Sequence, residues 1–449
     1  MEKKVTFGSK FGTIAVVAGS VIGLGNIWRF PYLAGSNGGS AFIIIYILCS
    51  LTIAIPIMMS EFVIGRSTGK NAFGAFRDLS KNKIWCLVGL LGVLTVFFIF
   101  SFYSVVAGWA ISFFQTAITD GFTGRDTKEI HTNFINYINS GWKPTISALI
   151  FIIMTAGVVI GGIEKGIERI NKILMPMLAL ILIGLLIYST TLSGFSQSID
   201  FLLKPDFSKI GIGTVLAAIG QSFFSMSLGM GCMITYGSYL KTNTSLPRLA
   251  LIIGIADLFI AIIAGFAIFP GVFTYGIEPT SGPTLVFETL PLVFSMMPAG
   301  NIIGVFFFLL VFIAAITSSV SMLEPICLFT IQELKISRVK STILISSIVM
   351  ILAVFCAYSQ VDGSTIKLFG KSLFDFLNNA TDKLMMPIGA LFIIIFIGWV
   401  ANKNLVRDQI TNKGLLFNKG FNVYYTAVKY FIPLILSLFV LNLLGIINC

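Results

Sequence analysis

Long apolar segments with almost no charged residues recur along the whole chain and are separated by short polar stretches. Each is 18 or more residues long, so as a helix it can cross a hydrocarbon core of about 30 Å. The segments do not alternate apolar and polar residues as the strands of a membrane barrel would. The pattern predicts eleven transmembrane helices, approximately at 11–36, 40–64, 84–119, 144–162, 170–192, 210–240, 246–275, 300–333, 340–359, 374–400 and 424–447.

Composition and charge support an all-α membrane protein. Of the 449 residues, 56% are hydrophobic and only 11% are charged, which lies outside the range of soluble proteins. With a cytoplasmic N-terminus, 21 of the 30 Lys and Arg residues fall on the cytoplasmic side and seven fall outside. This asymmetry explains the net charge of +11 by topology, so no nucleic-acid partner is expected. We expect a multi-pass protein of a bacterial inner membrane, with its C-terminus outside.

Several kinds of chemistry are not indicated by the sequence. The six cysteines are scattered without CxxC spacing, and the single histidine, His131, has no ligand partners nearby in sequence. The string GRSTGK at 65–70 is one residue too short between its glycines for a phosphate-binding loop and follows an apolar segment. No nucleophile with an adjacent base is apparent, so we do not expect an enzyme, and no organic cofactor is expected.

Two apolar segments contain residues that weaken helices. Residues 18–32 read AGSVIGLGNIWRFPY and residues 220–231 read GQSFFSMSLGMG, in the first and sixth predicted helices. An unwound stretch within lipid is tolerated only where it lines a cavity or binds a ligand. Simple close packing of small residues is the alternative, and the spacing of Gly19 and Gly23 fits it.

The matching positions of these segments favour a transporter built from two inverted halves. Many secondary transporters break the first helix of each half, and the free N–H and C=O groups there bind an anion and a cation together. An amino-acid zwitterion with Na⁺ suits this arrangement. The expected divisions are a cytoplasmic N-terminal segment (1–10), a first repeat (11–200), a second repeat (201–400), and a cytoplasmic loop with one extra helix (401–449).

Seven strings together resemble a known family: GSVIGLGNIWRFPY, NGGSAF, FYSVVAGWA, GQSFFSMSLG, AGFAIFP, AAITSSVSMLEP and FIGW. They look like those of the neurotransmitter:sodium symporters, which have the LeuT-type fold, and the likeness runs from Lys4 to Trp399. The predicted eleven helices resemble a bacterial branch that carries tyrosine and other hydrophobic amino acids. The resemblance implies a 5+5 inverted repeat with helices 1 and 6 broken at mid-membrane.

The resemblance also implies two sodium sites and a substrate site. The first sodium site would consist of Val21, Asn26, Ser225 and Asp257, and the second of Gly19, Ile22, Ala314, Thr317 and Ser318. Both sets supply the oxygen ligands that hard cations prefer. The substrate site would be formed by Val21, Leu24, Gly25, Ile99, Tyr103, Phe224, Ser225, Ser227, Met230, Ser318 and Met322. The two methionines favour large hydrophobic or aromatic amino acids. Asp257 resembles the fixed carboxylate that replaces chloride in bacterial relatives, so we expect no chloride requirement.

The outer gate departs from the family pattern. Arg29 and Phe224 match the residues that close the site on the outer side. The acidic residue usually opposite the arginine is replaced by Asn378, which leaves Asp375 and Asp382 as flanking acids. The sequence therefore leaves open which acid, if any, pairs with Arg29.

The inner gate departs from the family pattern as well. The family's N-terminal basic residue and tryptophan correspond here to Lys4 and Phe7, and their partner aspartate to Gln332, beside Glu333. The candidate inner-gate residues are Lys4, Tyr236 and Glu324. If no substitute pair forms, the protein would open inward more readily than its relatives.

Other functions remain open from the sequence alone. An amino-acid-gated receptor or channel could share the same pocket. A related fold that couples protons or sugars is the nearest alternative, opposed by the two oxygen-rich constellations. The sequence favours no particular oligomeric state.

Overall fold

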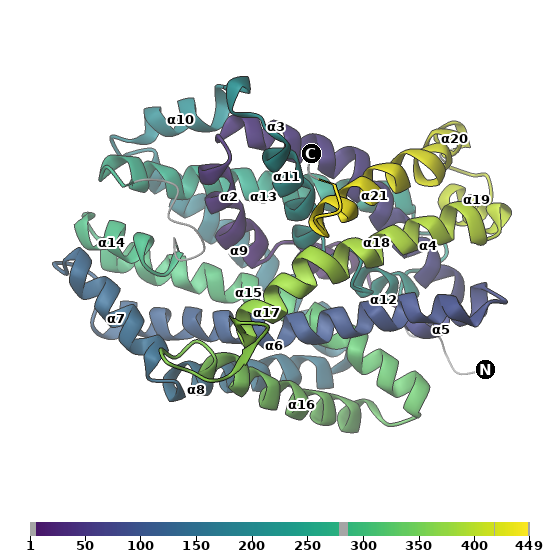
Figure 1. The fold of residues 1–449 in the computed structure, drawn as a ribbon, viewed down its shortest axis with the longest axis horizontal. Coiled ribbons are helices and arrows are strands. Elements are labelled where there is room, and N and C mark those ends of the chain that lie inside the picture. Colours follow the sequence, from purple (N-terminus) through teal and green to yellow (C-terminus); the bar gives the residue numbers. More distant parts are fainter. Residues whose placement is uncertain (1–5, 278–285, 417, 448–449) are drawn as a thin grey trace.

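Helices make up nearly all of the regular structure of the chain (Figure 1). The computed structural model describes residues 6–277, 286–416 and 418–447. The helices in chain order are α1 (Lys10–Val21), α2 (Phe30–Ser36), α3 (Ser40–Cys49), α4 (Ile55–Thr68), α5 (Ala72–Leu79), α6 (Cys86–Thr119), α7 (Thr127–Asn139), α8 (Trp142–Ile160), α9 (Arg169–Ser189), α10 (Phe195–Leu203), α11 (Ile212–Ser225), α12 (Cys232–Ser238), α13 (Leu246–Thr274), α14 (Thr289–Met296), α15 (Gly300–Leu334), α16 (Arg338–Tyr358), α17 (Leu373–Ala380), α18 (Met386–Ile395), α19 (Lys403–Thr411), α20 (Asn418–Thr426) and α21 (Ile432–Leu443). Two short antiparallel strands, β1 (Lys367–Leu368) and β2 (Lys371–Ser372), form a hairpin before α17.

Short turns of other helical types extend several of these helices. The 3₁₀ turns are Lys83–Trp85 and Phe207–Lys209. The π-helical turns are Gly25–Arg29, Ser50–Ala54, Ile163–Glu168, Thr381–Met385, Phe396–Val400 and Ala427–Phe431. A π-helical turn contains one residue more than an α-helical turn and is common where a helix serves a function.

All eleven ranges predicted from the sequence fall on helices. In the described residues, nine continuous helical segments are long and apolar enough to cross a membrane. A further pair, Lys10–Val21 and Gly25–Ser36, passes the same test together but is bent by 45°. The range 210–240 consists of two short helices, α11 and α12, with irregular chain between them at 226–231.

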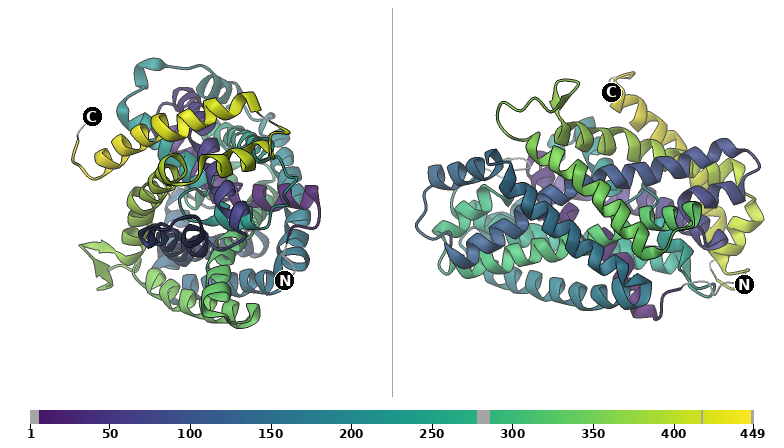
Figure 2. Two further views of the ribbon diagram at one scale, coloured as in Figure 1. Left: turned by 90° about the vertical axis from the view of Figure 1, so that its right-hand side faces the viewer. Right: turned by 90° about the horizontal axis from the view of Figure 1, so that it is seen from below.

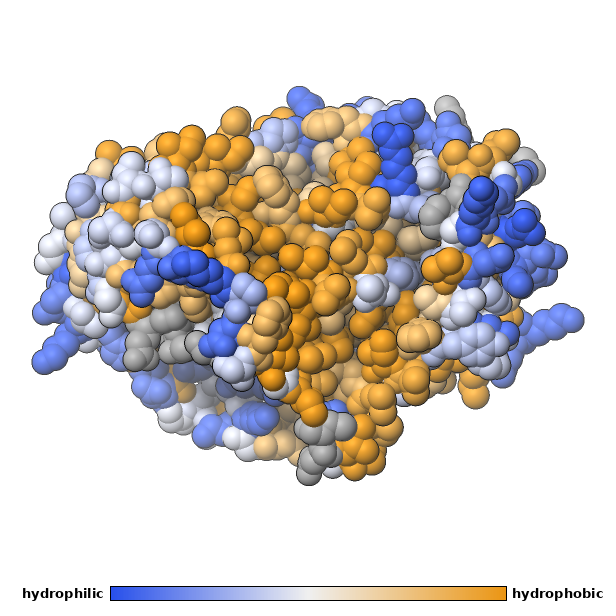
Figure 3. Space-filling view, turned by 90° about the horizontal axis from the view of Figure 1, so that it is seen from above, coloured by the Kyte–Doolittle hydropathy of each residue, from blue (hydrophilic) through white to orange (hydrophobic). Residues whose placement is uncertain are grey.

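The surface has the layout of a protein that crosses a membrane. An apolar belt covers the middle of the face shown in Figure 3, and hydrophilic side chains gather at both ends. Apolar side chains on the long helices are exposed as well, such as Leu180 on α9 at 70% and Phe259 on α13 at 62%. The two views in Figure 2 show that most helices run along the long axis. Helices α7, α10 and α14 lie at one end, whereas α5 and α19 lie at the other (Figure 1).

The apolar core of the bundle encloses several acidic side chains. Helix α15 packs against α1, α6, α8 and α9, and α4 packs against α12 and α13. Glu61 on α4, Asp257 on α13 and Glu324 on α15 are completely buried, as is Asn26 in the π-helical turn Gly25–Arg29. Buried carboxylates are costly unless they are hydrogen-bonded or paired, so the bundle centre is the place to look for a functional site.

Candidate functional site

The first helix breaks where the sequence predicted a weak point. Helix α1 ends because Ile22 adopts an extended conformation (φ −80°, ψ 96°). Gly23 then passes so close to α15 that a Cβ atom there would lie 2.2 Å from the Ser318 hydroxyl oxygen. The freed N–H of Gly23 donates to Asn26 Oδ1 at 3.1 Å. Peptide groups at this break therefore face the bundle interior instead of continuing a helix.

The second break separates α11 from α12. Ser227, Gly229 and Gly231 all have left-handed conformations (φ 53°, 75° and 77°), which end the helix within a few residues. The N–H of Gly229 donates to Glu61 Oε1 at 2.8 Å, which places a buried carboxylate beside the start of α12. The Ser227 hydroxyl donates to the Ser20 carbonyl at 2.9 Å and ties the two breaks together.

A small cavity lies between the two breaks. It is lined by Ser20, Val21, Gly23, Leu24, Gly25, Ile99, Tyr103, Phe224, Ser225, Ser227, Met230, Ser318 and Met322. All eleven residues predicted for the substrate site are among these. Its volume is about 20 Å³, room for about one water molecule. A larger ligand therefore enters only when the methionine and aromatic side chains around the cavity rearrange.

The carboxylate of Asp257 accepts three side-chain hydrogen bonds beside this cavity. Its Oδ1 atom accepts from Asn26 Nδ2 at 2.8 Å and from the Ser225 hydroxyl at 2.6 Å. Its Oδ2 atom accepts from the Tyr46 hydroxyl at 2.8 Å. The structure thus joins three of the four residues predicted for the first sodium site, and the fourth, Val21, lines the adjoining cavity. All three donors are neutral, so this completely buried carboxylate can accommodate a cation next to it.

The residues predicted for the second sodium site lie where α1 meets α15. The Ser318 hydroxyl donates to the Gly19 carbonyl at 3.3 Å. The Thr317 hydroxyl donates to the Ala314 carbonyl at 3.1 Å. Ile22 is the residue at which α1 ends. The cluster offers carbonyl and hydroxyl oxygens from both helices, which is the ligand chemistry that sodium prefers.

The predicted outer gate contains an ion pair that the sequence left undecided. Both guanidinium nitrogens of Arg29 bond the two carboxylate oxygens of Asp382 at 2.8 Å. The guanidinium also lies 4.6 Å from the centre of the Phe224 ring. Two predicted outer-gate residues are not in this pair: the exposed Asp375 bonds Ser372 at the start of α17 instead. The backbone carbonyl of the other, Asn378, accepts from the hydroxyl of Thr381 in the following π-helical turn.

The predicted inner gate contains aromatic and charged contacts. Phe7 is only 1% exposed and packs against the rings of Tyr236 and Tyr239, with ring centres 6.1 and 5.9 Å away. The Tyr239 hydroxyl donates to Glu324 at 2.6 Å, and Arg338 pairs with the same carboxylate at 2.6 Å. Two of the predicted inner-gate residues, Tyr236 and Glu324, therefore belong to one cluster with Phe7 and Tyr239.

The remaining inner-gate predictions have other outcomes. Lys4 lies outside the described residues. Gln332 accepts from the backbone and side chain of Asn71, while Glu333 pairs with Arg77 at 2.7 Å. In the described structure these two residues connect α15 to the segment around α5.

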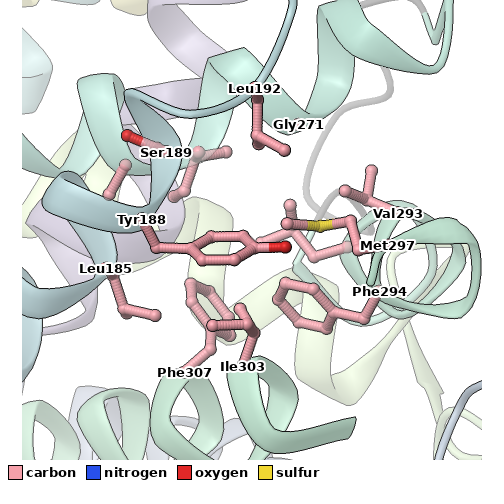
Figure 4. Close-up of a pocket in the computed structure, with 13 residues that line it drawn as sticks. Leu185, Tyr188, Ser189, Leu192, Gly271, Val293, Phe294, Met297, Ile303 and Phe307 are labelled. Carbon is pink, nitrogen blue, oxygen red and sulfur yellow. The ribbon is translucent and has the colours of Figure 1, made fainter. Parts of the chain in front are cut away.

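A second cavity lies away from all of these residues (Figure 4). It is enclosed by α9, α13, α14 and α15. Phe294, Met297 and Phe307 contribute to a mostly apolar wall, and the Tyr188 hydroxyl is already used by the Pro298 carbonyl at 2.8 Å. This cavity offers no charged group, so the helix breaks remain the candidate site.

Comparison with known proteins identifies the family. Two matches to the sodium:neurotransmitter symporter family cover residues 4–132 and 121–448, nearly the whole chain. The chain is a member of this family. It is therefore a sodium-dependent membrane transporter and not an enzyme.

The sequences of two relatives align with this symporter over nearly their full length. It is 34% identical over 447 residues to the uncharacterized sodium-dependent transporter YhdH of Bacillus subtilis (strain 168), covering 100% of this chain and 99% of the relative. It is 38% identical over 454 residues to an uncharacterized sodium-dependent transporter of Haemophilus influenzae, covering 98% and 99%. The crystal structure of MhsT in complex with L-phenylalanine superposes with a TM-score of 0.90 at 36% identity, covering 98% of this chain and 100% of that one. The symporter thus has the LeuT-type fold.

Two residues of this symporter that support the site were missed from the sequence. Glu61 could have been noticed as a lone acid inside the apolar range 40–64, because charged residues within the membrane are usually functional. Tyr46 gave no such signal, since single polar groups are common in membrane helices. Gln221 belongs to the helix-weakening string at 220–231, and its Nε2 atom donates to the Gly25 carbonyl at 2.8 Å, which connects α11 to the break in the first helix.

Proposed function

We propose that the protein couples the uptake of one amino acid to the entry of sodium by alternating access. The observation that carries this proposal is the cavity between two helix breaks, bordered by the Asp257 network on one side and by the Gly19–Ser318 oxygen cluster on another. Peptide N–H groups at the end of a broken helix suit the carboxylate of a zwitterion, and the surrounding oxygens suit its cation partner.

The substrate proposed is a large hydrophobic or aromatic amino acid. Its carboxylate would lie near the Tyr103 hydroxyl and the first break, and its side chain would contact Ile99, Phe224, Met230 and Met322. Methionine side chains adapt to different shapes and make favourable contacts with aromatic rings. The bound L-phenylalanine of the MhsT crystal structure supports this class.

Two sodium ions would accompany the substrate. The first would bind between Val21, Asn26, Ser225 and Asp257, where the substrate carboxylate completes its shell. The second would bind the oxygen cluster of Gly19, Ile22, Ala314, Thr317 and Ser318. Asp257 provides a fixed negative charge at the first ion, so transport would require no chloride.

Sodium is an adequate energy source for this transport. Each charge that crosses 100 mV supplies about 2.3 kcal/mol, and a tenfold gradient adds about 1.4 kcal/mol per ion. Two sodium ions with a neutral zwitterion would therefore supply roughly 7.4 kcal/mol, enough for a substrate ratio on the order of 10⁵.

The proposed topology places eleven helices in a bacterial inner membrane. Helices α1 to α9 would form the first half of a 5+5 inverted repeat and α11 to α18 the second. The end with α5 and α19 would face the cytoplasm, as would the N-terminus, and the C-terminus would lie outside. The positive-inside distribution of Lys and Arg supports this orientation.

Uptake into liposomes by the purified protein tests the function. We expect labelled L-tyrosine, L-tryptophan or L-leucine to accumulate under an inward sodium gradient, with or without chloride. Replacing sodium by potassium should abolish the accumulation. Equal uptake in potassium would contradict sodium coupling, and competition by glycine and alanine alone would contradict the proposed substrate class.

A further inference from the structure

The N-terminal segment covers the inner end of the first helix. The N–H of Phe7 donates to the Tyr239 carbonyl at 3.2 Å, and Lys241 Nζ donates to the Gly8 carbonyl at 3.2 Å. Ser9 then caps α1, because its hydroxyl oxygen accepts from the N–H of Gly12 at 2.9 Å. Any opening of the inner side that moves α1 must therefore detach this segment.

One buried carboxylate accepts hydrogen bonds from several polar groups of the segment. Glu168, at the end of the π-helical turn before α9, is only 2% exposed. Its Oε2 atom accepts from the N–H of Gly8 at 2.7 Å, and its Oε1 atom accepts from the N–H and hydroxyl of Ser9 at 3.2 and 2.9 Å. Lys172 pairs with Oε1 at 2.6 Å and balances the charge. Hydrogen bonds to an ionised acceptor are roughly twice as strong as neutral ones.

The other inner carboxylates have different partners. Glu324 pairs with Arg338, and Glu333 pairs with Arg77. Gln332, at the position where the family's aspartate is expected, bonds Asn71. Within the described residues, Glu168 is the carboxylate that bonds the start of the first helix.

We propose that Glu168 is a positioning residue of the inner gate in this protein. Its hydrogen bonds to Gly8 and Ser9, here called the latch, hold α1 in the position that closes the inner side. This inference rests on the proposed function and deepens its gating step. Helix α1 is continuous from Lys10 to Val21, about 18 Å, so it connects the latch directly to the break that borders the cavity. Ligands that fix the upper end of α1 favour the latched arrangement, and release of the latch frees the helix to swing.

Gly12 packs closely against the Glu168 carboxylate, so a substitution at Gly12 tests the latch independently. A Cβ atom at Gly12 would lie 1.9 Å from Glu168 Oε1 and 2.3 Å from its carboxyl carbon. Gly12→Ala would therefore push the carboxylate away without changing residue 168. Alanine is also the better helix former, so the change does not weaken α1 itself.

Hydrogen exchange of the Gly8 and Ser9 amides measures the latch directly. In sodium and without any amino acid, Glu168→Gln should raise their exchange rate about tenfold, because the acceptor loses its charge. Gly12→Ala should have the same effect. The matched controls are Glu164→Gln, an exposed acid in the same π-helical turn, and Gly184→Ala on α9, where a Cβ meets nothing within 4 Å. Both controls should exchange like the wild type.

The sodium dependence of amino-acid binding should change together with the exchange rate. Glu168→Gln and Gly12→Ala should raise the sodium concentration for half-maximal amino-acid binding about tenfold, while thermal stability stays near that of the controls. Unchanged exchange at Gly8 and Ser9 in both variants would overturn the latch. Failure of the wild type to bind any amino acid in sodium would overturn the proposed function instead, because the exchange test needs only the folded protein.

Discussion

Asp257 determines the electrostatics of the candidate site at the scale of single residues. It is completely buried and bonded by Asn26, Ser225 and Tyr46, none of which carries a charge. A buried anion without a cationic side chain is stabilised when a cation binds next to it. The proposed first sodium ion and this carboxylate therefore depend on each other.

Replacement of Asp257 by asparagine should change the ion requirement of transport. Asparagine keeps the volume of the side chain but removes the charge, so a mobile anion must replace it. We expect Asp257→Asn to be inactive without chloride and to be either restored by chloride or inactive throughout. Uptake assays in chloride and gluconate buffers measure this directly. A variant with wild-type uptake in both buffers would contradict the assignment.

The outer ion pair gives a second prediction with an internal control. Asp382→Asn should weaken amino-acid binding about tenfold, because the pair with Arg29 is bidentate and mostly buried. Asp375→Asn on α17, the preceding helix, should bind normally, since Asp375 is exposed and contacts Ser372. Binding titrations of the two variants distinguish them. Equal effects, or a larger effect at Asp375, would show that another acid closes the outer side.

The sequence indicated which residues surround the cavity but not which partners their side chains bond. Glycine, serine and asparagine in the first and sixth helices marked the cavity, because such residues are unusual together in the middle of a membrane helix. The identity of the acid opposite Arg29 depends on how α17 and the π-helical turn Thr381–Met385 are wound, because that turn carries Asp382. Helix winding of this kind leaves no trace in the hydrophobic pattern.

At the scale of elements, the two helix breaks differ in their causes. The first is a single extended residue, Ile22, held by the close approach of Gly23 to α15. The second is a loop of six residues, 226–231, with three left-handed conformations. The sequence suggested that the second break could begin as early as Gly220, but α11 continues regularly to Ser225.

Alanine substitutions at two glycines should reveal the limits of the second break. Gly229 has φ 75°, and a Cβ there would lie 2.2 Å from the Met386 carbonyl oxygen. Gly229→Ala should therefore lower the melting temperature by several degrees and abolish binding, since left-handed backbone alone costs about 1–2 kcal/mol. Gly220→Ala should be tolerated, because Arg29 at 4.0 Å is the nearest atom to its Cβ. Thermal melts and binding of both variants provide the measurement; a harmless Gly229→Ala would contradict this description.

The helix pattern itself was predictable for a simple reason. Lipid requires every backbone group of a spanning segment to bond within that segment, so long apolar runs become helices regardless of their partners. The structure differs mainly where polar packing decides, as at α11 and α12, each too short to span alone. The π-helical turns were also unforeseen, because one extra residue in a helix does not change its hydrophobicity.

At the scale of the whole molecule, charged and aromatic contacts lie at both predicted gates. Arg29 pairs with Asp382, while Phe7 packs against Tyr239 and Glu324 pairs with Arg338. The sequence suggested a weak inner gate if no substitute pair formed, and this stays a prediction. The Glu324–Arg338 pair is one candidate substitute, and Glu168 supplies another contact from a segment that the sequence indicated only as a cytoplasmic loop.

Reciprocal binding of sodium and amino acid tests the central claim most directly. If the substrate carboxylate completes the shell of the first sodium ion, each ligand must increase the affinity of the other by the same factor. Calorimetric titration of the purified protein with L-phenylalanine at several sodium concentrations, and with sodium at several L-phenylalanine concentrations, gives both factors. We predict equal factors of about tenfold or more. Binding of L-phenylalanine with the same affinity in sodium and potassium would contradict the account.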